Sequence, residues 1–363
     1  MSSTEYRTQG GLHVRREIRQ RLYRPAETAL GEALDRRRGV LFSSSFEFPG
    51  RYTRWDMGFI DPPLVFTARG RGFVIEALNE RGGILLPAIA AAISGLADVH
   101  IDAGMPERLS GEVAAAAERF PEEARSRQPS VFSVLRALVR LFGSAQDQHL
   151  GLYGAFGYDL VFQFEPMPLK LPRPADQRDL VLYLPDEILM VDHMRQQAAL
   201  HRYEFSVGGR STEGLPRATA EAPYRLDRAP TARPAESDHG PGEYAALVER
   251  AKESFVRGDL FEVVPGQLFA DRCADRPSTV FHRLRQANPA PYGALINLGE
   301  GEFLVAASPE MYVRVEGRRI ETCPISGTIA RGRDAVEDAE RIRELLNSRK
   351  DESELTMCTD VDR

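Results

Sequence analysis

The stretch ETCPISGTIARG, residues 321–332, begins in a β-like run and passes through a proline into Ser326, Gly327 and Thr328. Small residues let a backbone approach a ligand closely, and amide N–H groups in such a segment suit an anion. The same letters also fit a strand that ends in an ordinary surface loop. The choice between these two interpretations depends on the neighbouring sequence.

Two hairpin patterns lead into this stretch. GALINL and FLVAAS flank the turn GEGE within residues 293–308, and MYVRV and IETC flank EGRR within residues 311–323. Apolar runs joined by short polar turns are typical of antiparallel strand pairs. After the stretch, Asp334 followed three residues later by Glu337 predicts the capped start of a helix.

An amphipathic helix is predicted upstream, at residues 243–258. Its apolar residues from Tyr244 to Phe255 recur at helical spacing, and Gly258 stands where a helix stops. DLFEVVPGQLF, residues 259–269, then predicts a strand. Helices that alternate with antiparallel strands favour the α+β class over a doubly wound parallel sheet.

The N-terminal half contains the same kinds of element. Strand-like runs occupy residues 40–80, 179–193 and 198–207, and helical spacing occupies residues 105–144. ILLPAIAAAISGLA, residues 84–97, is too short to span a bilayer and predicts a buried helix. Residues 208–242 are rich in proline, alanine and charge without a period, so they predict an extended linker.

Composition limits the class of protein. The 363 residues carry a net charge of −6, with 42% apolar and 28% charged residues, which indicates a globular protein and argues against nucleic acid or an anionic membrane as partner. The cysteines, Cys273, Cys323 and Cys358, have no paired spacing, and the N-terminus lacks the apolar core of a signal peptide. We therefore expect reduced thiols and a cytoplasmic location.

The last residues continue a helix-like pattern. The sequence ends at Asp360-Val361-Asp362-Arg363 with no glycine or proline to stop a helix. We expect a longer polypeptide that is C-terminally truncated here.

Four stretches of the second half carry a family resemblance. They are GDLFEVVPGQ (258–267), NPAPYGALI (288–296), ASPEMYV (307–313) with ETCPISGTIARGR (321–333), and KDESELTMCTDVDR (350–363). With them the chain resembles the chorismate-utilising enzymes, and among these the large component, component I, of anthranilate synthase in its fused bacterial form. GLYGAFGYD and MVDH match loosely in the N-terminal half.

The resemblance implies a fold and a division of the chain. The fold is a layered sandwich of large antiparallel β-sheets flanked by helices, incomplete at the C-terminus. Residues 1–207 form an N-terminal region with a regulatory tryptophan site, residues 208–242 a linker, and residues 243–363 part of the chorismate-binding catalytic region.

The implied reaction is a step of tryptophan biosynthesis. Chorismate and ammonia, which a glutamine amidotransferase domain or subunit releases from glutamine, give anthranilate and pyruvate, with Mg²⁺ as cofactor. The resemblance places Glu310 at the acid–base position and gives Gly327 and Thr328 backbone contacts to a chorismate carboxylate. An isolated Ser-Pro-Glu would favour a surface glutamate at the end of a strand, but the accompanying motifs favour the acid–base role for Glu310.

The resemblance aligns Glu354 with a Mg²⁺ ligand and Asp351 with the acidic residue one turn earlier. Residues three apart on a helix share a face, so both carboxylates can reach one site, although a solvated acidic face has the same spacing. The family supplies further ligands downstream. Arg331 and Arg333 either add positive potential to the site or lie on the surface.

Two side chains separate this reaction from related ones. At the position of Ser326, aminodeoxychorismate synthases commonly have a lysine. Near the position of Glu262, isochorismate-forming relatives have a lysine. Both residues therefore favour anthranilate synthase, although glutamine is the common residue at position 262. Aminodeoxychorismate synthesis, isochorismate or salicylate synthesis, and an inactive tryptophan-binding fragment remain alternatives. We expect the fragment alone to be inactive.

A second site is implied for tryptophan as feedback inhibitor. The resemblance places it between an NPSPYM-like loop and a serine-bearing strand, whose residues here are Ser44, Ser45, Asn288, Pro289, Tyr292 and Gly293. The prolines stiffen the loop, and a serine hydroxyl can bond the polar end of the ligand. A rigid turn without a ligand is the alternative interpretation.

Overall fold

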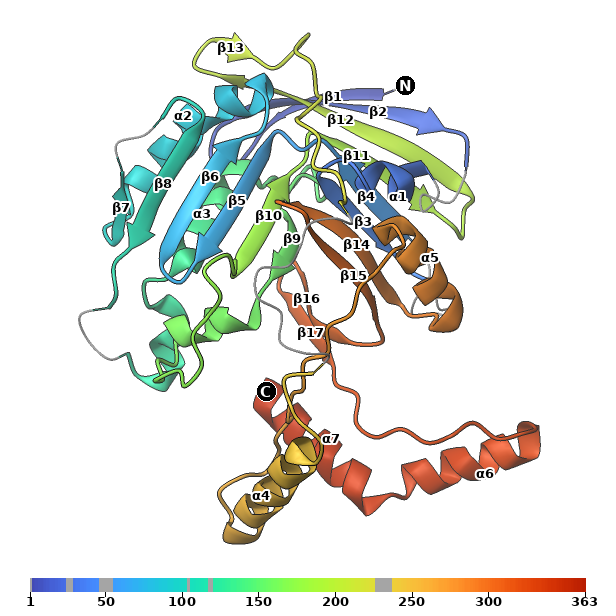
Figure 1. Ribbon diagram of the computed structural model, residues 1–363. Coiled ribbons are helices and arrows are strands. Elements are labelled where there is room, and N and C mark those ends of the chain that lie inside the picture. The colour runs from blue at the N-terminus through green and yellow to red at the C-terminus, as the bar shows by residue number, and fades with distance from the viewer. Residues whose placement is uncertain (1, 24–28, 46–54, 103–104, 117–119, 226–236) are drawn as a thin grey trace.

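Two large antiparallel sheets and a separate hairpin organise the chain. The computed structural model describes residues 2–23, 29–45, 55–102, 105–116, 120–225 and 237–363. In this part, a nine-stranded sheet runs β1 (Ser2–Arg7), β2 (His13–Arg21), β12 (Gln197–Val207), β11 (Glu187–Asp192), β4 (Trp55–Ile60), β3 (Gly39–Ser43), β14 (Tyr292–Gly299) and β15 (Glu302–Ser308), with β13 (Arg210–Ser211) paired to β12. The six-stranded sheet runs β7 (Val99–Ile101), β8 (Arg108–Val113), β6 (Gly72–Ala77), β5 (Leu64–Arg69), β10 (Leu180–Leu184) and β9 (Tyr153–Phe156). The hairpin pairs β16 (Met311–Glu316) with β17 (Arg319–Cys323) (Figure 1).

Helices cover and flank these sheets. They are α1 (Ala29–Leu34), α2 (Glu80–Ser94), α3 (Val131–Phe142), α4 (Glu243–Arg257), α5 (Pro277–Ala287), α6 (Ala335–Leu346) and α7 (Arg349–Asp362), with 3₁₀ turns at Glu122–Arg127 and Tyr158–Gln163. The antiparallel pairing confirms the predicted α+β class. None of the helices in the described ranges has the length and apolarity that crossing a bilayer requires.

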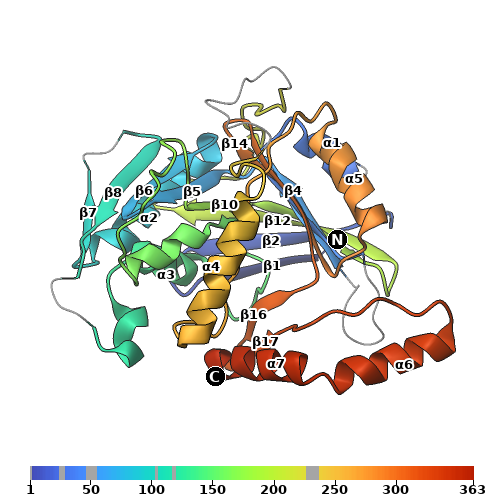
Figure 2. The ribbon, with the colours of Figure 1, turned by 60° about the horizontal axis from the view of Figure 1, so that its bottom comes forward.

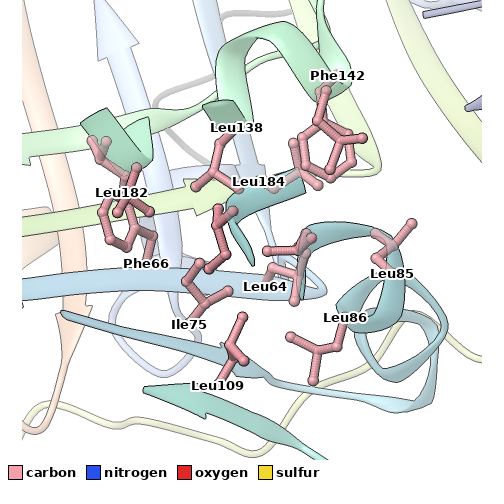
Figure 3. Close-up of a cluster of buried hydrophobic side chains, with 14 of the residues drawn as sticks. Leu64, Phe66, Ile75, Leu85, Leu86, Leu109, Leu138, Phe142, Leu182 and Leu184 are labelled. Carbon is pink, nitrogen blue, oxygen red and sulfur yellow. The ribbon is translucent and has the colours of Figure 1, made fainter. Parts of the chain in front are cut away.

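The main core lies where α2 and α3 pack against the six-stranded sheet and the β1–β2–β12 end of the larger sheet. Figure 3 shows side chains from these elements converging: Leu64, Phe66, Ile75, Leu85, Leu86, Leu109, Leu138, Phe142, Leu182 and Leu184. Each fully buried Leu or Phe contributes about 1.5–3 kcal/mol relative to exposure. The predicted buried helix at 84–97 is α2, which begins earlier because Asn79 accepts a hydrogen bond from the amide of Gly82.

Strands from both halves of the chain form the nine-stranded sheet. β14 pairs with β3 so that Gly293 stands opposite Ser43. A side chain at Gly293 would overlap the Ser43 carbonyl oxygen, because a Cβ there would lie 2.6 Å from it. The loop before β14 is thereby held against the end of β3.

The first part of the predicted linker is extended and anchored. Arg217 forms an ion pair with Glu204 at 2.8 Å, and the amides of Ala222 and Tyr224 donate to carbonyl oxygens of residues 35–36. The fully buried Arg81 donates to the carbonyl oxygens of Thr212 and Leu215. Residues 226–236 lie outside the described ranges.

Two local predictions are wrong. Residues 108–113 were expected to be helical but form β8, where burial of Leu109, Gly111 and Val113 follows the two-residue period of a strand. The helical prediction at 114–120 lies partly outside the described residues, and the one at 131–143 is confirmed as α3. Residues 259–269 form no strand, since only Phe269 makes a single bridge, to Ser237, and a strand needs a continuous partner.

The last three predicted helical segments are confirmed, but they pack little. α4 ends at Gly258 with φ of +80°, and Asp334 caps α6 by accepting from the amides of Val336 and Glu337. The capping box is incomplete because the Glu337 carboxylate accepts from the amide of Arg333 instead. Figures 1 and 2 show α6 and α7 apart from both large sheets, and in the described chain no residue of α4, α6 or α7 is buried.

Candidate active site

The stretch at 321–332 lies against the first turn of α7. Ser326 Oγ donates to the Asp351 carbonyl oxygen at 2.8 Å, and Ser348 Oγ caps the helix by accepting from the Asp351 amide. Gly327 has φ of +63°, and a Cβ there would overlap the Asp351 carboxylate. Only glycine allows this close approach without strain. The structure therefore brings Gly327 to Asp351, while the neighbouring Thr328 is exposed.

Glu310 lies at a cavity of about 570 Å³ beside the C-terminal half of α7. It follows β15, where its amide donates to Ser308 Oγ at 3.2 Å. The cavity is lined by residues from three segments: Phe261 and Glu262; Glu310, Met311, Tyr312 and Pro324; and Met357, Cys358, Asp360, Val361 and Asp362. Gly327, Thr328, Asp351 and Glu354 are not among these lining residues as described.

Cys358 lies on the same helix as Asp351 and also lines the cavity at Glu310. Its pKa is raised, first because the thiol is partly removed from water and then because of the carboxylates of Glu262, Glu354, Asp362 and Glu310. Glu310 and Cys358 line the same cavity, whereas Glu354 is near Cys358 because it precedes it by one turn of α7. Asp351 and Gly327 lie further toward the start of the same helix.

The electrostatic character of the cavity is acidic. Glu262, Glu310, Asp360 and Asp362 line it, and the described lining contains no basic residue. Carboxylate oxygens are the donors that Mg²⁺ prefers. However, the described residues contain no group of three or more His, Cys, Asp or Glu side chains arranged to hold a metal ion. The donors suit Mg²⁺ chemically, but the described residues do not gather into a complete site.

Arg331 and Arg333 are engaged elsewhere. Arg331 forms an ion pair with Asp338, and Arg333 pairs with Glu337 at 2.8 Å. Both carboxylates belong to α6, so these arginines fit the surface interpretation.

The loop 288–291 and the end of β3 do meet. Ser45 Oγ accepts from the Ala290 amide at 3.1 Å and donates to the Ala290 carbonyl oxygen at 3.2 Å, while the Ser45 amide donates to the same carbonyl at 3.0 Å. Asn288 and Pro289 are exposed beside this contact, and Ser44 is half-buried. Five of the six predicted tryptophan-site residues thus adjoin the β3–β14 junction, including Gly293 opposite Ser43.

Tyr292, the sixth of these residues, is influenced by charged groups of the β16–β17 hairpin. Its pKa is raised because the phenol is partly removed from water, with the positive charge of Arg314 opposing and Cys323 and Glu321 adding to the rise. Those three residues belong to the hairpin, where Arg314 also pairs with Glu321. The loop and the strands that lead to Gly327 are therefore electrostatic neighbours.

A buried polar network behind β3 was not predicted. Ser43 Oγ donates to Asp56 Oδ1 at 2.6 Å, His193 Nε2 lies 3.0 Å from Asp56 Oδ2, and Tyr23 Oη lies 3.0 Å from His193 Nδ1. Asp56 is fully buried on β4. The sequence contained one signal for this network, namely Asp56 within an otherwise apolar strand-like run. Its partner His193 is the last residue of the MVDH sequence.

Comparison with known proteins identifies relatives. Residues 104–363 match the family model described as chorismate binding enzyme. The chain is 57% identical over 358 residues to an anthranilate synthase from Azospirillum brasilense, covering 99% of this chain and 48% of that protein. It is 30% identical over 332 residues to anthranilate synthase component 1 from Serratia marcescens, covering 87% of this chain and 62% of that protein.

A solved structure, the menaquinone-specific isochorismate synthase from Escherichia coli, matches 99% of this chain and 64% of that chain with 14% identity and a TM-score of 0.49. The chain spans about half to two thirds of the length of the curated relatives it matches.

Proposed function

The chain belongs to the chorismate-binding enzyme family, and on this premise we propose that it is part of the large component of an anthranilate synthase. The observation that carries the proposal is the 57% identity along 99% of the chain to the Azospirillum brasilense anthranilate synthase. The position of Glu310 at a cavity that is also lined by residues of α7, the helix that carries Glu354, supports it. Chorismate would be the substrate.

In the proposed reaction, ammonia adds to the ring of chorismate as the ring hydroxyl departs as water, and pyruvate is then eliminated to leave anthranilate. Glu310 would donate the proton that the poor hydroxyl leaving group needs. Gly327 and Thr328 would direct backbone amides at a substrate carboxylate, and Gly327 already holds the positive φ that such a close approach uses.

The acidic lining makes a counter-charge necessary, because chorismate is itself a dianion and carboxylates repel it. We propose that Glu354, with Asp351 one turn earlier, helps to hold Mg²⁺, with water and further oxygen ligands completing the site. Bound Mg²⁺ would supply positive charge to the ring carboxylate. Ammonia from a glutamine amidotransferase and a cytoplasmic location remain parts of this proposal.

Tryptophan is the proposed feedback inhibitor. Support comes from the contact of Ser45 with Ala290 and from Tyr292, which begins β14 directly after this loop and whose pKa is influenced by Arg314 of the β16–β17 hairpin. A ligand that displaces the loop would move a residue electrostatically coupled to the strands before Gly327. Inhibition would follow from a shift between two arrangements of these segments.

The test is a fluorescence assay of anthranilate formation by the full-length polypeptide with chorismate, Mg²⁺ and ammonium. Glu310→Gln should lower kcat by about 10²–10⁴-fold because the proton donor is lost. Glu316→Gln, an exposed residue at the end of β16, is the matched control and should retain activity. Chromatography that finds aminodeoxychorismate or isochorismate instead would refute the assignment.

We also propose that residues 1–363 alone do not turn over. The reason is physical: in the described chain α4, α6 and α7 bury no side chain, so the helix bearing Asp351 and Glu354 has little to fix its position. Turnover by this piece at the rate of the full-length polypeptide would contradict the proposal.

A further inference from the structure

A groove of about 780 Å³ lies between α2 and α3, and it shares no lining residue with the cavity at α7. Leu12 and Leu141 are buried at its floor, and Leu96 and Val207 are half-buried there. Small side chains keep it hollow, namely Ala88, Ala91 and Ala92 of α2 and Ala137 of α3. The volume is in the range of about 300–1,000 Å³ that small-molecule sites occupy.

Two arginines stand on one side of this apolar groove. Arg136 and Arg140 line it, both are exposed, and they are four residues apart on α3. Residues at this spacing are neighbours on one helix face. Arg136 reaches only the Ser126 carbonyl oxygen, at 3.5 Å, and within the described ranges neither guanidinium forms an ion pair.

Arg136 and Arg140 add local positive charge to a chain whose net charge is −6. Arg81 and Arg217, by contrast, lie within ion-pair distance of carboxylates. Two adjacent cations without a carboxylate leave positive potential over an apolar surface. Such a surface complements a molecule with an apolar body and an anionic end.

We propose that the α2–α3 groove binds a small organic anion of the medium-chain carboxylate class. The apolar body lies along α2, where residues 88–94 span about 9 Å, and displaces water from the leucine floor. The carboxylate accepts hydrogen bonds from Arg136 and Arg140. The site is independent of the proposed reaction, since no residue of the candidate active site contributes to it.

Isothermal titration of the full-length protein with sodium decanoate, below the concentration at which it forms micelles, tests the proposal. We expect saturable binding of one decanoate per chain. The double variant Arg136→Gln/Arg140→Gln should weaken it about tenfold or more, because charge-assisted hydrogen bonds are lost. The matched control is Arg108→Gln, an exposed arginine of β8, which should bind as the wild type does.

Two further measurements distinguish binding in this groove from binding to exposed apolar surface elsewhere on the protein. Ala137→Phe should block binding by filling the groove, with an unchanged thermal unfolding curve showing that the variant folds. Decanol, which lacks the charge, should bind the wild type about tenfold more weakly than decanoate. No saturable binding, equal affinity for decanol, or unchanged affinity in the double variant would overturn the proposal, and so would occupation of the groove by an acidic helix or a second copy of the chain.

Discussion

Because His201 on β12 is buried, we expect the free energy of unfolding to fall in mild acid. Its side chain is buried in the core, with 7% of the residue exposed, and its ring packs edge-on against His149 with 5.1 Å between ring centroids. In the described structure Nδ1 has no hydrogen-bond partner. Asp147 and Arg16 are the other charged groups that act on it, and they pair with each other at 3.2 Å.

The lowered pKa of His201 determines the sign and size of this change in the free energy of unfolding. Burial, followed by the neighbouring His149, lowers the pKa of His201 from 6.5 to about 4, while Asp147 opposes the change. Between these values the unfolded chain holds a proton that the native chain does not, so acidification favours unfolding. The contribution is complete above pH 6.5 and is lost as pH falls to about 4. It corresponds to about 3 kcal/mol of the free energy of unfolding.

Urea unfolding at pH 4.5 to 7.5, followed by the fluorescence of Trp55, the single tryptophan, measures this loss in the sheet that contains His201. His201→Gln should unfold with a weaker pH dependence than the wild type, because the titrating group is absent. His100→Gln, an exposed histidine on β7, is the control and should keep the wild-type dependence. If His201→Gln retained the full wild-type pH dependence, the argument from burial would be refuted.

Three other substitutions test the remaining contacts. Gly327→Ala should cost about 1–2 kcal/mol at its positive φ and lower kcat/KM for chorismate, whereas unchanged kinetics would separate this backbone from the substrate. Arg81→Met should lower the free energy of unfolding by about 3–5 kcal/mol, since removal of the fully buried guanidinium leaves the buried Asp186, among the described residues, with only Arg217, 3.6 Å away; a loss below 1 kcal/mol in urea titrations would count against that ion pair. Ser45→Ala should raise the tryptophan concentration for half inhibition about tenfold by removing the two hydroxyl hydrogen bonds to Ala290, and an unaltered inhibition curve would dissociate the loop from regulation.

Local patterns predicted the elements whose structure depends on near neighbours. The helix at 243–257 ends at Gly258 because glycine adopts positive φ readily, and the hairpins β14–β15 and β16–β17 close over short polar turns. The predictions failed where distant partners decide. Residues 108–113 become a strand because β6 and β7 lie on either side. Residues 259–269 form no strand, although most of them are apolar, because only Phe269 makes a single bridge.

The candidate site shows the same division. The sequence alone determined which residue types could bind an anion or a divalent cation, and the order of motifs that identifies the family. Only the tertiary structure decided that Gly327 meets Asp351, that Glu310 and Cys358 line one cavity, and that Ser45 joins Ala290 across 245 residues. The reason is that helix and turn preferences arise from interactions over a few residues, whereas these contacts depend on how segments far apart in the chain pack together.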